Sequence, residues 1–152
     1  MSVDVVTETV IDRPRTEVAA FTTDPENAPR WYANIKSVEW STDPPLRLGS
    51  RIAFVAEFLG RRLAYTYEIV EYVPDERVVM RTAEGPLPME TTYTWASSGQ
   101  GSTRMTLRNR GLPSGFSKLA APVMAASMRK ANRKDLERLK QLLEAPEVPA
   151  VC

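Results

Sequence analysis

The chain has 152 residues, of which 43% are hydrophobic, a size and composition that fit one globular domain rather than a disordered chain. The chain has 20 basic and 19 acidic residues, which gives a net charge of +1. Proteins that bind nucleic acids or membrane surfaces have a marked excess of basic residues, so the charge does not support either function. Histidine is absent and Cys152 is the only cysteine, which excludes imidazole catalysis and any disulfide within the chain.

The first predicted elements are a strand and two short helices. Val3–Ile11 is rich in β-branched residues and predicts the strand. Pro14 suits the first turn of a helix. Asp24-Pro25 ends that helix, and a second short helix is expected at about Glu26–Tyr32.

Six further segments alternate between apolar and polar residues, as half-buried strands do. They are Val38–Trp40, Arg51–Leu59, Leu63–Ile69, Val78–Thr82, Met89–Ala96 and Thr103–Arg108. The turns between most of them are too short for parallel crossovers. The pattern therefore predicts an α+β protein with an antiparallel sheet that has one face on a core.

The last predicted element is a helix of about 23 residues within Gly115–Glu144. Ser114 is a candidate cap, and Pro122 must lie in the first turn or kink the helix. Spacings of three or four place one set of residues on a shared face: Ala125, Met128, Asn132, Leu136, Leu139 and Leu143. We expect one domain over residues 1–145 and a flexible tail over 146–152, where two prolines prevent the helix from continuing.

Aromatic rings and methionines are concentrated on the predicted inner face of the sheet and on the facing side of the helix. Rings with polar tips and adaptable thioethers are typical of small-molecule sites. The candidate ligand-binding residues are Phe54, Phe58, Tyr67, Met89, Tyr93, Trp95, Met105, Met124, Met128 and Asn132. Each can also be explained as core filling, and Asn132 can equally bond a neighbouring backbone group.

Few residues are candidates for chemistry. The inner-face tyrosines Tyr65, Tyr67 and Tyr93 are hydrogen-bond donors, and no pair of carboxylates has a spacing that indicates a hydrolase. Glu71 falls in the inner register at the end of its strand, where a bulge would turn it outward. We therefore treat these three tyrosines and Glu71 as the candidate catalytic residues.

Several local motifs resemble those of one known superfamily. They are Ile11-Asp12-Arg13-Pro14 leading into Glu17-Val18, then Trp31 and Gly49, Tyr67–Pro74, Gly101–Leu107, and Asp135-Leu136 through to Glu144. The chain resembles the START-like or Bet v 1-like (SRPBCC) superfamily over about residues 3 to 144, and within it the bacterial polyketide cyclase/dehydrase-like group.

The resemblance implies a helix-grip fold. In this fold a curved, seven-stranded antiparallel sheet wraps around a long C-terminal helix, and two short helices follow the first strand. It also implies a cavity for lipids, polyketides or other hydrophobic ligands. Aromatase/cyclases of this group hold a poly-β-ketone with pocket tyrosine and arginine residues. Near Trp31 the sequence has Tyr32 and then Ile35, which departs from that pattern.

Three functions fit these observations. The first is binding of a small hydrophobic molecule that is polyketide-like, lipid-like or aromatic. The second is a polyketide cyclase or dehydratase in which pocket tyrosines hydrogen-bond a developing enolate. The third is a module that binds a protein partner. The sequence has no zinc motif, phosphate loop or basic patch, so we expect no metal, cofactor or nucleic acid. A homodimer is compatible with the sequence, which does not specify the oligomeric state.

The sequence also gives an expectation of cellular location. Residues 1–10 alternate in polarity, whereas a signal peptide has a basic start and an unbroken apolar run. No apolar stretch approaches the roughly 18 residues of a membrane-spanning helix. We expect a cytoplasmic protein with no membrane span.

Overall fold

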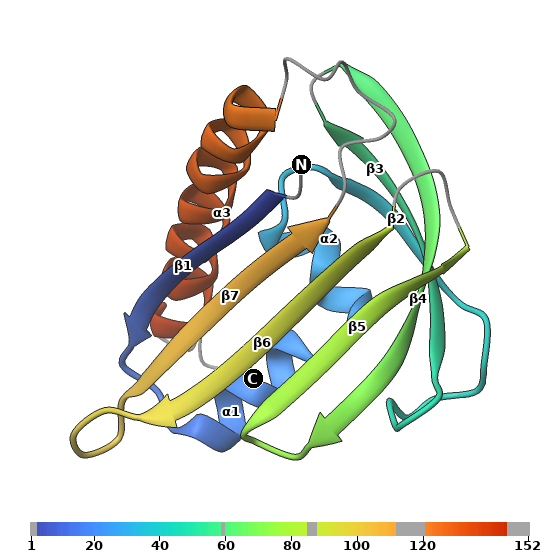
Figure 1. Cartoon of the computed structure of the whole chain (residues 1–152). Helices are drawn as coiled ribbons and strands as arrows, with labels where there is room; N and C mark the ends of the chain where they lie inside the picture. Colours follow the sequence, from blue (N-terminus) through green and yellow to red (C-terminus); the bar gives the residue numbers. More distant parts are fainter. Residues whose placement is uncertain (1–2, 59, 85–87, 112–120, 146–152) are drawn as a thin grey trace, which may run out of the picture.

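A curved antiparallel sheet of seven strands partly encloses the helical elements (Figure 1). The computed structural model describes residues 3–58, 60–84, 88–111 and 121–145, with the side chains of residues 58 and 121 excepted. The strands are β1 (Val3–Ile11), β2 (Ile35–Trp40), β3 (Arg51–Phe58), β4 (Arg61–Val73), β5 (Arg77–Glu84), β6 (Met89–Ser97) and β7 (Thr103–Gly111). Their order is β1-β7-β6-β5-β4-β3-β2.

Every neighbouring pair of strands is antiparallel, which confirms the predicted sheet. β1 and β2 form opposite edges of the sheet, and the link between them contains the short helices. The register of β4 shifts at Thr66/Tyr67 and again at Ile69/Glu71 against β5. Bulges of this kind bend a strand and increase its twist, and so they help the sheet to curl.

The helices are α1 (Arg15–Thr22), the single 3-10 turn η1 (Pro25–Asn27), α2 (Ala28–Trp31) and α3 (Ala121–Glu144). The predicted second helix is therefore divided into η1 and α2. Asp24 begins this segment, because its side chain accepts a hydrogen bond from the Glu26 amide at 3.0 Å. Pro122 lies in the first turn of α3, where a missing N–H is tolerated. Ser114 and the predicted tail lie outside the described residues.

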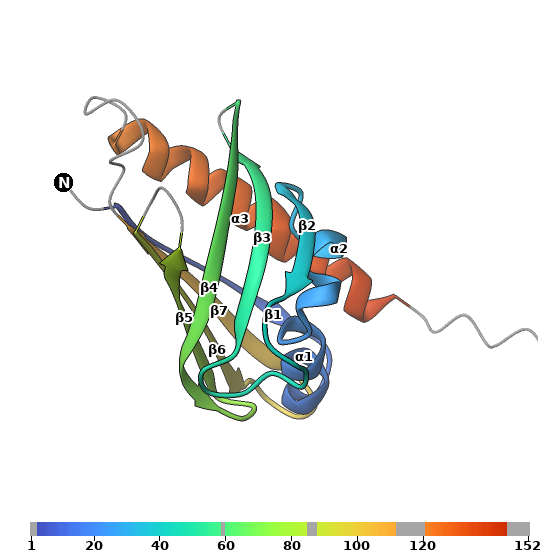
Figure 2. The same ribbon diagram turned by 90° about the vertical axis from the view of Figure 1, so that its right-hand side faces the viewer.

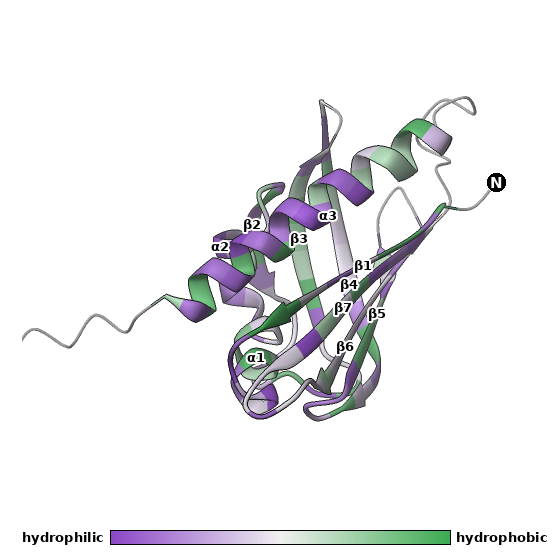
Figure 3. Cartoon of the chain, turned by 90° about the vertical axis from the view of Figure 1, so that its left-hand side faces the viewer, coloured by the Kyte–Doolittle hydropathy of each residue, from purple (hydrophilic) through white to green (hydrophobic). Residues whose placement is uncertain are grey.

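Helix α3 crosses the open, concave side of the sheet and packs along β1 (Figure 2). Hydrophilic residues occupy much of its outward side (Figure 3), as mixed charges in the sequence predict. On its inward side Leu136 and Leu139 are fully buried in the main core. Met124 packs in a separate small cluster with Val3 and Val5. The apolar packing along α3 is therefore divided into two parts.

The inner register of the sheet agrees with the alternation in the sequence. Tyr67, Tyr93 and Trp95 are all less than 8% exposed. Thr92 is buried as well, although it belongs to the outer register, where it pairs with Val79 and Arg108. The structure confirms the helix-grip arrangement: a curled seven-stranded sheet, a long C-terminal helix and short helices after the first strand.

Candidate functional site

A cavity of about 160 Å³ lies between α3 and the concave face of the sheet. An apolar cavity of similar size can hold a benzene ring. The predicted ligand-binding residues that line it are Phe54, Tyr67, Met89, Tyr93, Met124, Met128 and Asn132. The candidate catalytic residue Tyr65 lines it too. The cavity therefore lies where the packing along α3 is divided.

Two predicted lining residues lie elsewhere. Trp95 and Met105 are 3% and 0% exposed and belong to the solid core, not to the cavity wall. Trp95 on β6 and Met105 on β7 are paired across the two strands. Helix α1 covers this end of the sheet, and its residues Val18 and Ala19 belong to the same core cluster. The two short helices fill that end of the fold, which leaves the open space nearer Met89.

Glu71, a candidate catalytic residue, does not line the cavity. Glu71 is exposed and forms an ion pair with Arg77 at 3.1 Å. The register shift between Ile69 and Glu71 turns its side chain away from the inner face. The side chain of Phe58 lies outside the described residues.

Aromatic rings form one wall of the cavity. The rings of Phe54, Tyr65 and Tyr67 contact one another, with centroids 5.0 to 5.8 Å apart. Alternation on β3 and β4 places all three on the inner face. Such contacts hold rings in fixed orientations, so this wall offers a flat apolar surface.

Three strands supply a chain of hydrogen bonds at the sheet side of the cavity. The Thr91 hydroxyl donates to Asn109 Oδ1 at 2.8 Å. Because that uses its only proton, Thr91 accepts the 2.8 Å hydrogen bond from the Tyr67 hydroxyl. Thr91 and Asn109 line the cavity but were not among the predicted site residues. Both follow from period two, since Asn109 shares a face with Leu107 and Thr91 shares one with Tyr93.

A second pair of hydroxyls lies near the short helices. Tyr32, directly after α2, bonds Tyr93 through their hydroxyl oxygens at 2.7 Å. The Tyr32 ring stacks on Trp31 with centroids 3.9 Å apart. Sequence reasoning gave Tyr32 no role, because nothing in its local pattern shows that this short connection folds over the cavity.

Burial keeps the cavity tyrosines uncharged. It raises the pKa of Tyr67 to about 12, although the hydrogen bond with Thr91 opposes the shift. Burial also raises the pKa of Tyr93, Tyr65 and Tyr32 well above the usual value. At neutral pH these hydroxyls are therefore hydrogen-bonding groups, not bases.

Asp135 is the one carboxylate among the described residues of the cavity wall. It is 3% exposed and accepts a hydrogen bond from the Ala33 amide at 3.1 Å. Burial raises its pKa to about 6, while the Ala33 amide and the Arg138 guanidinium act in the opposite direction. A buried carboxyl group that titrates near neutrality is a frequent mark of a functional site. The sequence offered a signal, because Asp135 lies one helical turn after Asn132.

Asn132 is a polar residue on the otherwise apolar inward face of α3. It is 6% exposed and lines the cavity. Its Nδ2 atom is buried and has no hydrogen-bond partner in the structure as described. A bond from this amide to a neighbouring backbone group, one of the two expectations for Asn132, is therefore not formed. A buried donor without a partner costs about 1–3 kcal/mol.

The described residues contain no group of three or more His, Cys, Asp or Glu side chains that could hold a metal ion. Within the same residues no helix is long and apolar enough to cross a membrane.

Solved structures share this fold. The protein TTHA0849 from Thermus thermophilus superimposes with a TM-score of 0.78 at 21% identity, over 92% of this chain and 96% of the other. The Zhui aromatase/cyclase from Streptomyces sp. R1128 gives 0.78 at 14% identity, over 95% and 94%. A START superfamily protein from Mycobacterium smegmatis gives 0.75 at 16% identity, over 91% and 98%. At these identities the likeness shows the fold alone.

No curated protein matches the chain. The family model described as polyketide cyclase/dehydrase and lipid transport matches residues 2–144, which is nearly the whole sequence and includes every element of the sheet and α3. The chain therefore belongs to the polyketide cyclase/dehydrase and lipid transport family.

Proposed function

We propose that the protein binds a small hydrophobic molecule, polyketide-like, lipid-like or aromatic, in the cavity beneath α3. The observation that carries the proposal is a mainly apolar cavity of about 160 Å³ whose wall also holds the polar side chains of Asn132 and several tyrosines. Pockets for small molecules combine apolar walls with a few placed polar groups. Family membership supports the same function, because the family includes lipid transport.

The proposal is tested with N-phenylnaphthylamine, an uncharged dye whose fluorescence rises in apolar surroundings. The dye should bind the native protein and be displaced by polyketide-like or lipid-like compounds. Replacing Met128 with Trp should fill the cavity and abolish binding, while the melting temperature changes little. In a solid core the same change would overpack the interior at a cost of about 1–3 kcal/mol.

Val123→Trp is the matched control. Val123 lies on the same helix, is 60% exposed and does not line the cavity. The control protein should bind the dye as the parent does. If the parent protein binds no dye and Met128→Trp lowers the melting temperature strongly, the cavity residues are only core and the proposal fails.

The structure also favours a second candidate, a cyclase or dehydratase. The Tyr65 hydroxyl lies in the cavity wall and bonds no residue that the structure describes. A neutral tyrosine of this kind can donate a hydrogen bond to a developing enolate. Tyr67 is less suited, because its proton is used by Thr91.

The enzyme candidate is tested by incubation with a short poly-β-ketone thioester and analysis of the products by mass spectrometry. Tyr65→Phe should lower the rate of cyclisation by about 10²-fold or more, while dye binding is retained. Tyr72→Phe is the control, because Tyr72 is outside the cavity. Absence of any cyclised or dehydrated product with the parent protein would leave binding as the function.

A further inference from the structure

A second hollow lies on the surface of the molecule, next to the cavity. It is an open groove of about 440 Å³ between α1 and the loop that joins β2 to β3. Its wall includes Ala20 of α1, the half-buried ring of Trp40, and Pro44 and Pro45 of the loop. An indole ring and two prolines give an apolar chain a surface to pack against.

The groove and the cavity share part of their walls. Thr23, Pro25 and Leu46 line both of them. The Thr23 hydroxyl donates to the Ala19 carbonyl at 2.7 Å, so its proton is used within α1. At these residues the two spaces are separated by no more than the thickness of one side chain.

Leu46 belongs to a part of the loop that packing alone holds in place. The side chains of Thr42 and Ser50 accept hydrogen bonds from backbone amides at 3.0 and 2.9 Å, which fixes the loop on both sides. Between them, residues 43–46 form no hydrogen bond with any residue that the structure describes. Leu46 is half-buried against the main core. Its side chain can therefore turn aside without breaking a hydrogen bond, which keeps the cost of opening low.

The size of the cavity gives a reason to look for more space. Its volume of about 160 Å³ is similar to that of an apolar cavity that holds one benzene ring. Polyketide-like and lipid-like compounds carry longer chains than a single ring. Such a ligand needs a place for the rest of its length, and the groove offers one directly beyond Leu46.

We propose that the groove is a second subsite for the ligand of the cavity, and that the ligand extends into it past Leu46. The ligand is then an elongated apolar compound, with a ring in the cavity and a chain that lies against Trp40, Pro44 and Pro45. This inference rests on the proposed binding function and adds to it the length of the ligand and the direction in which the ligand extends.

The test uses 2-phenylethanol and 8-phenyloctanol, two uncharged compounds with the same ring and hydroxyl that differ by six methylene groups. Each displaces N-phenylnaphthylamine from the protein, which gives its dissociation constant. A fully buried methylene strengthens binding about fourfold. Because the groove is open on one side, we expect about twofold for each methylene, so the longer compound should bind about 50-fold more tightly.

Ala20→Arg fills the groove from an exposed position on α1. Its guanidinium can pair with Asp24 or Asp75, which also line the groove. The advantage of the longer compound should then fall to about fivefold or less, while the affinity for 2-phenylethanol is unchanged. Thr16→Arg is the matched control, since Thr16 is exposed on α1 and lines neither space. It should keep the full advantage.

A measurement without a change at Ala20 covers the case in which that variant fails to fold. The protein is labelled with 5-fluorotryptophan, and the fluorine NMR signal of Trp40 is identified as the one that Trp40→Phe removes. This signal should shift with 8-phenyloctanol and not with 2-phenylethanol. The signal of Trp95, in the solid core, should shift with neither.

Three results overturn the inference. They are equal affinities of the parent for the two compounds, the same advantage of the longer compound in Ala20→Arg as in the parent, and a Trp40 signal that 8-phenyloctanol does not move. Failure of the parent protein to bind the neutral dye would instead overturn the proposed function.

Discussion

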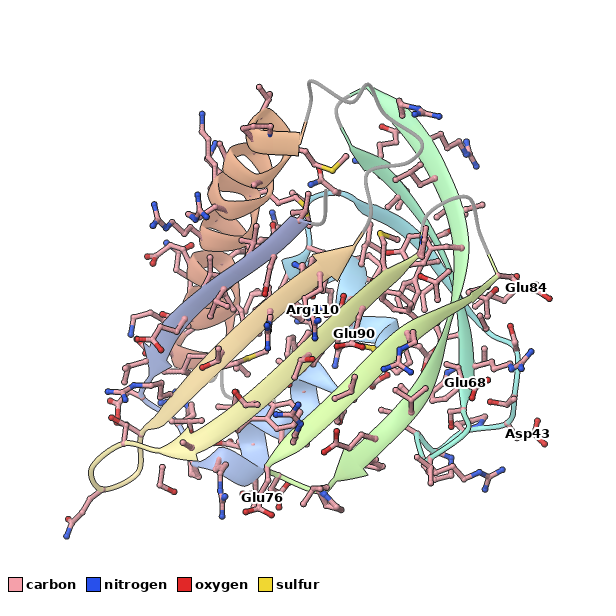
Figure 4. The ribbon with its side chains drawn as sticks, in the orientation of Figure 1. Asp43, Glu68, Glu76, Glu84, Glu90 and Arg110 are labelled. Carbon is pink, nitrogen blue, oxygen red and sulfur yellow. The ribbon has the colours of Figure 1, made fainter. Side chains whose placement is uncertain are left out.

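On the outer face of the sheet opposite charges meet across neighbouring strands, whereas on the inner face hydroxyl and amide groups converge on a cavity. The outer row crosses six strands in the order Arg51, Glu68, Arg81, Glu90, Arg110 and Asp4. Glu90 bonds Arg81 at 2.8 Å and lies 3.6 Å from Arg110. Figure 4 shows Glu90 and Arg110 side by side on β6 and β7.

The same strands build both faces, so the difference lies in how their polar groups are satisfied. Outer charges are paired with each other and are also exposed to water, which costs little. On the inner face Tyr67 and Thr91 are satisfied by hydrogen bonds, but the amide of Asn132 is not. The indole nitrogens of Trp31 and Trp95 are also buried without a partner, although they lie in the solid core. The candidate site is therefore located by the cavity and its polar lining, not by unpaired polar groups or by the number of charges nearby.

The comparison can be sharpened first within the inner face, where the largest effect is expected. Met105 is fully buried in the solid core, whereas Met89 is only partly buried and lines the cavity. Met105→Ala should lower the free energy of unfolding by about 2–5 kcal/mol, because it creates a new void. Met89→Ala should cost less than about 2 kcal/mol, since it enlarges an existing space. Equilibrium unfolding in urea measures both.

Equal losses for the two methionines would contradict the comparison. They would mean that the space near Met89 is filled by packed side chains in solution. A change in the slope of the urea transition would show instead that one variant alters the unfolded state or the two-state behaviour.

The second prediction concerns Asp135, whose burial raises its pKa from 3.8 to about 6. Between about pH 4 and pH 6 the carboxyl group is therefore protonated in the folded state and ionised in the unfolded state. The stability that comes from this protonation is fully present below about pH 4 and is lost as the pH rises to about 6. Asp135→Asn does not titrate and keeps an oxygen acceptor for Ala33. At about pH 8 it should be more stable than the parent by up to about 3 kcal/mol.

This gain should shrink as the pH falls toward about 4. Melting curves of both proteins across that interval measure the difference, and Glu137→Gln, an exposed change of the same kind on α3, should show almost none of it. A difference that is constant with pH would mean that the Asp135 carboxylate is well hydrated, and would remove it from the site.

Much of the fold could be predicted because its signals are local. Alternation along single strands gave the faces of β3, β4, β6 and β7, and spacings of three and four gave the inward side of α3. Seven of the ten candidate ligand-binding residues line the cavity for that reason. The shared face of Phe54 and Tyr67 needs no knowledge of distant parts of the chain.

What the sequence did not predict depends on contacts between distant elements. Trp95 and Tyr93 share a face of β6, but the packing of α1 at one end of the sheet decides which of them faces open space. Asp135 was not among the predicted site residues. It is buried because the segment after α2 docks beside it and its carboxylate accepts the Ala33 amide. Tyr32 reaches the cavity through the same docked segment, which no local pattern specifies.

The last and smallest expected effect returns to the outer face. Glu90→Gln removes the charge that lies between Arg81 and Arg110. Exposed ion pairs contribute about 0–1 kcal/mol each and are screened by salt. We expect a loss of less than about 1 kcal/mol in dilute buffer that nearly disappears at about 1 M salt. Glu39→Gln, an exposed change on edge strand β2, should have a still smaller effect.

Dye binding should be unchanged in both proteins, because neither residue lines the cavity. If Glu90→Gln weakened dye binding, the charge row would influence the shape of the sheet, and the two faces could no longer be treated as independent.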